Sequence, residues 1–107
     1  MIKRDVGGEL YKDLCEAIDT LEDRKDKCNK FVYINVATVI RSEIFTTSKL
    51  NKFGNNKNIW NYATSDEHRK RIVIEGNIVN FIKAGVIKNY KDDKNCLQDM
   101  LPIILKL

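Results

Sequence analysis

The sequence contains a single proline, Pro102, only four alanines, and no pair of cysteines spaced as C-x-x-C. Its three cysteines, Cys15, Cys28 and Cys96, have neither zinc-site spacing nor an even count, so we interpret them as reduced, buried thiols. No apolar run approaches the roughly 20 residues of a membrane span, and no apolar signal-peptide core follows the first residues. We therefore expect no membrane and no metal, and a cytoplasmic protein or, if the source is viral, one of the host-cell interior.

Motifs of common catalytic sites are also missing. The sequence has no G-x-S-x-G or H-E-x-x-H pattern, and none of its glycines precedes the G-K-[ST] ending of a phosphate loop. Its one histidine, His68, would need a nucleophile and an orienting acid placed around it to act as a general base, and Cys15 is expected on the opposite, acidic helix. We therefore expect neither an enzyme nor a cofactor.

What the chain does have is the composition of one folded domain spanning residues 1–107. It is 43% hydrophobic and 32% charged, with a formal net charge of +4. The charge is uneven: residues 9–27 hold seven acids against four bases, whereas residues 28–107 hold thirteen bases against seven acids. An acidic first segment on a basic body suggests separate surfaces, only one of which tolerates a polyanion. The alternative is a mildly basic protein that has no anionic partner, because the counts of acidic and basic residues would be the same in that case.

Three helices are expected before residue 64. The first, over about residues 8–27, has an apolar stripe at helical spacing that would pack on the core or on a second subunit. Residues 31–34 are rich in strand formers, so we expect a short extended entry before a helix over about 35–45. A third helix over residues 47–53 has Thr46 or Thr47 as its N-cap and ends at Gly54. The polar connection 55–63 has room for an extra helical turn.

Residues 64–90 carry the strongest local signals. Thr64 and Glu67 stand in the T-x-x-E relation of a capping box, and isoleucines then recur at helical spacing. Gly85 has the position of a left-handed C-cap residue, after which residues 86–90 form a plausible strand. Residues 91–95 resemble a hairpin tip. Pro102 should prevent a helix in the tail, so residues 103–107 are expected to return as a second strand.

A helix with a cationic start, an apolar body and a Gly-containing exit into a strand resembles the recognition helix and first wing strand of winged helix-turn-helix domains. The resemblance implies an α+β fold, mainly helical, with a C-terminal β-hairpin as the wing. Residues 33–38 (Tyr-Ile-Asn-Val-Ala-Thr) also resemble the Y-I-N-A-T opening of the KilA-N DNA-binding domain of viruses and phages. Both resemblances imply a DNA-binding protein.

The winged-helix resemblance implies three groups of DNA-contacting residues. The start of the helix at residue 65 would enter the major groove, while lysines of the preceding helix and loop, and of the wing, would hold phosphates. These residues are Lys49, Lys52, Lys57, Ser65, His68, Arg69, Lys70, Arg71, Lys91 and Lys94. The alternative for each of these residues is that it lies on a solvated surface and contacts no DNA. Trp60 and Tyr62 could stack on single-stranded bases, although a core position is the favoured interpretation of Trp60.

We therefore predict a small protein that binds double-stranded DNA and regulates transcription, replication, or phage or plasmid maintenance. The first helix and the apolar C-terminal segment would form a homodimer interface. The alternative is a protein-interaction module, such as a phage or viral inhibitor of a host protein, that works through the apolar tail and the acidic first helix.

Overall fold

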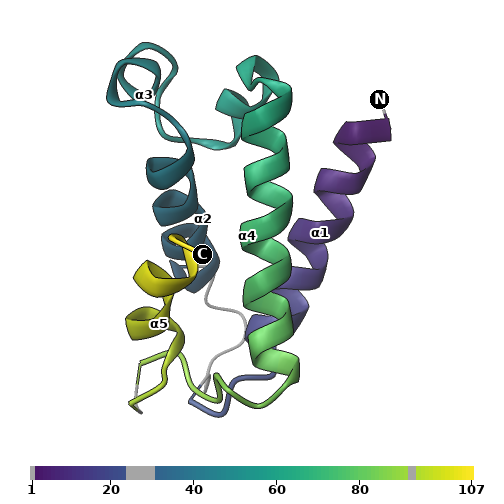
Figure 1. Ribbon diagram of the computed structural model, residues 1–107, viewed down its shortest axis with the longest axis vertical. Helices are drawn as coiled ribbons and strands as arrows, with labels where there is room; N and C mark the ends of the chain where they lie inside the picture. The colour runs from purple at the N-terminus through teal and green to yellow at the C-terminus, as the bar shows by residue number, and fades with distance from the viewer. Residues whose placement is uncertain (1, 24–30, 92–93) are drawn as a thin grey trace.

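The computed structural model describes residues 2–23, 31–91 and 94–107, with side chains from Tyr11 onward. Its helices are α1 (Ile2–Asp19), α2 (Phe31–Ile44), α3 (Thr47–Phe53), the 3-10 helix η1 (Lys57–Tyr62), α4 (Ser65–Lys83) and α5 (Leu97–Ile104). Helix α4 is central and contacts α1, α2 and α5. As Figure 1 shows, α1 flanks it on one side and α2 with α5 on the other, while α3 lies beyond the end of α2.

The core lies along the inner faces of α1, α2, α4 and α5. It contains aliphatic side chains at helical spacing, among them Leu14, Ile18, Val36, Ile40, Ile44, Ile74, Ile78, Ile82, Leu97, Leu101 and Ile104. Ala17 and Leu21 of the predicted apolar stripe are buried here as well. This part of the stripe thus packs within the chain itself, which leaves these residues no role in a dimer interface.

Both ends of α4 are as the sequence predicts. The Thr64 hydroxyl accepts the Glu67 amide at 3.2 Å, and a Glu67 carboxylate oxygen accepts the Thr64 amide at 2.8 Å, which completes the capping box. At the other end Gly85 has φ +79°. The amides of Val86 and Gly85 bond the carbonyls of Phe81 and Ile82, the pair of bonds that defines a Schellman motif.

The predicted wing is wrong. No part of the chain that the structure describes forms a strand, so the molecule is mainly helical and is not a winged helix with a C-terminal β-hairpin. Backbone groups of residues 86–90 find partners outside a ladder: the Lys88 carbonyl accepts the Glu22 amide, and those of Asn89 and Tyr90 accept the first amides of α5. The Asp23 carboxylate accepts the Tyr90 amide at 2.6 Å. Because these groups are already satisfied, the segment needs no partner strand.

The predicted second wing strand is also wrong, because the tail forms α5 with Pro102 inside it. Proline at this position removes the hydrogen bond that its amide would have made to the Gln98 carbonyl, and its ring crowds that carbonyl, at a cost of about 3 kcal/mol. Leu97, Leu101 and Ile104 lie on one face and are all buried. Burial of three large aliphatic side chains outweighs this cost, since each contributes about 1.5–3 kcal/mol.

The remaining helix boundaries are partly right. Helix α3 begins after Thr46, whose side chain caps it, and ends at Gly54, as predicted. The connection does carry an extra turn, η1. Helix α2 begins at Phe31, so the expected extended entry over residues 31–34 is wrong. Helix α1 ends at Asp19 instead of near residue 27; residues 24–30 lie outside the described part.

Candidate nucleic-acid interface

One end of the molecule is formed by α3, η1 and the first two turns of α4. We call residues 46–71 the cationic end, because they hold six basic residues against two acids, Asp66 and Glu67. The bases are Lys49, Lys52, Lys57, Arg69, Lys70 and Arg71. Five asparagines, which can donate to phosphate oxygens or base edges, lie among them. The arrangement concentrates positive charge and amide groups on one region of the fold.

Both acids of the cationic end pair with its own bases. Lys49 Nζ lies 2.7 Å from Glu67 Oε1, with both side chains mostly buried. Burial alone would raise the pKa of Glu67, but hydrogen bonds from Lys49 and Thr64, together with the Lys49 charge, hold that pKa below its usual value. Arg69 Nη1 lies 3.2 Å from Asp66 Oδ1 in a pair that is largely exposed. Neither carboxylate is therefore left as an uncompensated charge facing an anion.

Arg71, a predicted DNA contact, points into the molecule. Its Nε lies 3.0 Å from the Glu75 carboxylate, and its guanidinium lies 4.3 Å from the centre of the Trp60 ring. Trp60 also packs on Phe45 with ring centres 4.8 Å apart and lies against the core. The core position favoured for Trp60 is confirmed, and Arg71 is held by the packing around it.

The other predicted contacts fall into two places. Lys52, Lys57, Ser65, Arg69 and Lys70 have exposed side chains at the cationic end, where the half-buried His68 ring lies 5.8 Å from that of Trp60. Lys91 and Lys94 follow the opposite end of α4, beyond its C-terminus, and are not on a hairpin tip because the described residues on either side of them form no strand. The structure thus gathers eight of the ten predicted residues and separates the last two from them.

Sequence reasoning missed two buried charges. The Arg41 side chain of α2 is 8% exposed, and its Nε donates to Asn55 Oδ1 at 2.7 Å. Burial lowers the pKa of Arg41, partly offset by Tyr11. Glu75 of α4 is 3% exposed; burial raises its pKa, although Arg71 opposes the shift. The sequence does hold a weak signal of this burial in the helical spacing. Arg41 lies three residues before Ile44 and Glu75 three residues before Ile78, which places each on the same helix face as a core isoleucine.

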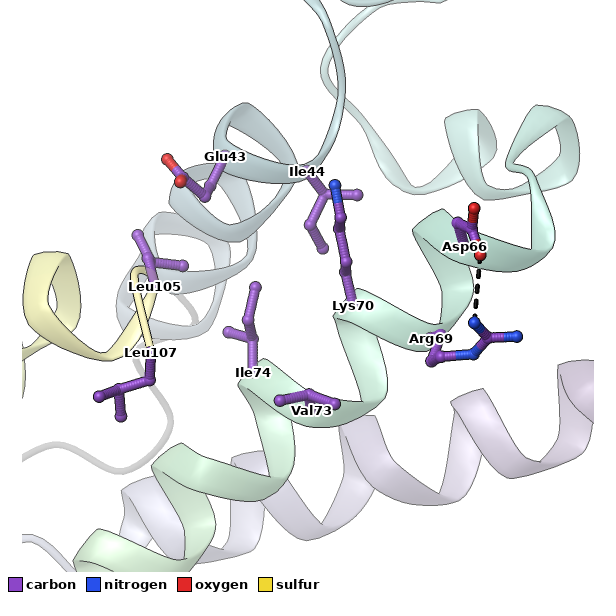
Figure 2. Close-up of a pocket in the computed structure, with 9 residues that line it drawn as sticks. All are labelled: Glu43, Ile44, Asp66, Arg69, Lys70, Val73, Ile74, Leu105 and Leu107. Carbon is purple, nitrogen blue, oxygen red and sulfur yellow. Dashed lines mark hydrogen bonds and ion pairs between the residues drawn. The ribbon is translucent and has the colours of Figure 1, made fainter.

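A groove lies between α2, α4 and the C-terminal residues. It has a volume of about 470 Å³ and is lined by five aliphatic residues and four charged ones. Figure 2 shows Val73 and Ile74 on α4 facing Leu105 and Leu107, with Lys70 rising beside Ile44 and Arg69 turned toward Asp66. Leu107 and Val73 are 71% and 50% exposed. An apolar surface of this kind is open to a ligand or partner.

Two other kinds of feature are absent from the described residues. No three His, Cys, Asp or Glu side chains among them are grouped so that they could hold a metal ion. None of the helices in this part of the chain is both long and apolar enough to cross a membrane.

Comparison of the chain with protein-family models, with curated proteins and with solved structures finds no match in any of the three.

Proposed function

We propose that the protein binds double-stranded DNA through the cationic end, without a wing. The observation that carries this proposal is the charge arrangement. Lys49, Arg69 and Arg71 each pair with a carboxylate, whereas Lys52, Lys57 and Lys70 are exposed with no carboxylate partner among the described residues. A surface with this excess of cations attracts the phosphate backbone irrespective of sequence. Much of the positive charge of the chain therefore lies on the surface that would bind the polyanion.

Arg69 and Lys70 are the residues best placed to contact the duplex. Both are exposed and lie on the second turn of α4, next to the lysines of α3 and η1. The Arg69–Asp66 pair is exposed at both side chains, 74% and 81%, so it is weak and a phosphate or a guanine edge can replace Asp66. Lys52 and Lys57 would hold the flanking backbone. Regulation of transcription, replication, or phage or plasmid maintenance would fit this activity.

The test is fluorescence anisotropy of a labelled mixed-sequence duplex at low and moderate salt. We compare the wild type with a variant in which Lys52, Lys57 and Lys70 are changed to Ala. The matched control changes the exposed Lys83, Lys88 and Lys91 to Ala, which removes the same charge from the other end of α4. Loss of affinity in the first variant alone supports the proposal; equal loss in both, or no binding by the wild type, refutes it.

The groove between α2, α4 and the C-terminus favours a second candidate, a protein-interaction module. The aliphatic part of its lining would accept the apolar face of an amphipathic helix from a partner protein. Lys70 and Glu43, which also line the groove, would pair with an acid and a base of that helix. Capture of a partner that Leu107→Ser and Val73→Ser abolish, in a protein without DNA affinity, would establish this function instead.

A further inference from the structure

The cationic end carries a stacked pair of aromatic rings at its surface. The rings of Phe53 and Tyr62 lie with centres 4.1 Å apart and planes inclined by only 11°. Phe53 is half-buried and packs against the core, whereas Tyr62 is 56% exposed. Because Phe53 covers one face of the Tyr62 ring, the exposed area of that side chain lies on its other face and edge.

The surroundings of this pair are those of a nucleic-acid site. Phe53 ends α3 and Tyr62 ends η1, so two separate elements fix the orientation of the rings. Lys52 Nζ lies 5.3 Å from the centre of the Phe53 ring. Residues 45–65, which contain both aromatics, hold three lysines and five asparagines and no acid. Flat, exposed aromatic faces among cations are the means by which proteins bind unpaired bases.

We infer that the exposed face of Tyr62 stacks on an unpaired base, so that the protein prefers a duplex with a single-stranded extension over a blunt duplex. This inference rests on the proposed function and adds the class of DNA. Lysines of the cationic end bind the backbone of the duplex, while Tyr62 receives the first base beyond it. A ring already held in place by Phe53 loses little conformational freedom on binding.

The experiment compares three labelled DNAs: a blunt duplex, the same duplex with a short single-stranded extension, and the single strand alone. Variants are Tyr62→Phe, which keeps a flat ring, and Tyr62→Leu, which keeps an apolar cover over Phe53 but cannot stack. Thermal melting of each variant checks that the fold is retained. The expected preference of the wild type for the extended duplex is about fivefold or more, as one stacked base provides.

Three outcomes are distinguishable. If the wild type and Tyr62→Phe prefer the extended duplex and Tyr62→Leu binds both duplexes equally, the inference stands. Equal binding of blunt and extended duplexes by the wild type, or an unchanged preference in Tyr62→Leu, overturns the inference but leaves duplex binding intact. If the wild type binds none of the three DNAs, both the inference and the proposed function fail.

Discussion

Lys49 of α3 and Glu67 of α4 form an ion pair at 2.7 Å, and the same Glu67 oxygen accepts the Thr64 amide of the capping box. One carboxylate thus caps α4 and also ties α3 to it across η1. Since the two helices make the cationic end, its geometry depends on this carboxylate. The pair also removes one cation and one anion from the surface offered to DNA.

Glu67→Gln should destabilise the protein in a pH-dependent way. The pKa of Glu67 is held below its ordinary 4.5, so the ionised side chain stabilises the fold above pH 4.5 and loses this effect as pH falls through the lower folded pKa. Glutamine can still accept the Thr64 amide, so the change removes chiefly the charge that pairs with Lys49. Urea denaturation at neutral pH should show a loss of about 1 kcal/mol, typical of such an ion pair. The difference from wild type should shrink in acid; a constant difference would contradict this role.

Arg71→Ala should be far more costly than Arg69→Ala. Removing Arg71 leaves Glu75, which is 3% exposed, as a buried charge without its cation, a change that costs about 3–5 kcal/mol. The Arg69–Asp66 pair is exposed, so its loss should cost no more than about 1 kcal/mol. Denaturant unfolding followed by Trp60 fluorescence measures both; comparable losses would show that the Arg71 pair is unimportant.

The effect of Arg71→Ala should itself depend on pH. Burial raises the pKa of Glu75 above its ordinary 4.5. The ionised carboxylate therefore destabilises the fold fully at a pH above the folded pKa, and this penalty is lost as the pH falls from the folded pKa toward 4.5, where the group becomes protonated. Stability curves of wild type and Arg71→Ala should therefore converge on acidification. Parallel curves between neutral pH and pH 4.5 would mean that Glu75 is not the charge left unpaired.

Two glycines should respond to alanine in opposite directions. Gly85 has φ +79° and open space around the position of a Cβ, so Gly85→Ala should lower the unfolding free energy by about 1–2 kcal/mol through backbone strain alone. Gly76 lies inside α4 with nothing within 4 Å of a Cβ, so Gly76→Ala should raise it by about 0.5–1 kcal/mol. Thermal melting of both variants measures these shifts, and a decrease for Gly76→Ala would show that its site is more crowded than described.

Salt dependence should reveal how many cations touch DNA. The logarithm of the binding constant falls by about 0.9 per phosphate contact for each unit of log salt concentration. Changing Lys52, Lys57 and Lys70 to Ala should therefore make the slope shallower by up to about 2.7, and the control at Lys83, Lys88 and Lys91 should leave it unchanged. An unaltered slope in the first variant would place the phosphates elsewhere.

Local signals in the sequence predicted local structure well. The capping box of Thr64 and Glu67, the left-handed Gly85, and the Thr46 and Gly54 ends of α3 are each set by a few neighbouring residues. Such interactions are complete within one helical turn, so no knowledge of the rest of the fold is needed to expect them.

Predictions that depend on distant contacts were the ones that went wrong. Residues 86–90 contain strand formers, but their backbone bonds go to Glu22, Asp23 and α5, which no local pattern shows. The propensity of residues 31–34 for strand was likewise overridden by packing of Val36, Ile40 and Ile44 along one helix face. Arg41 and Glu75 share a helix face with core isoleucines, but a charged side chain at such a position usually reaches the surface, and the packed helices are needed to show that these two are buried.

The absence of any buried residue among the seven of α3, all of them described, has a consequence for motion. Helix α4 contacts three other helices and should open only when the whole molecule unfolds, whereas α3 can detach at a small free-energy cost. Amide hydrogen exchange should therefore be fast in α3 and slow in α4. A ligand held by the cationic end would slow exchange in α3 first, so this helix would report occupancy of the site before any change reached the core.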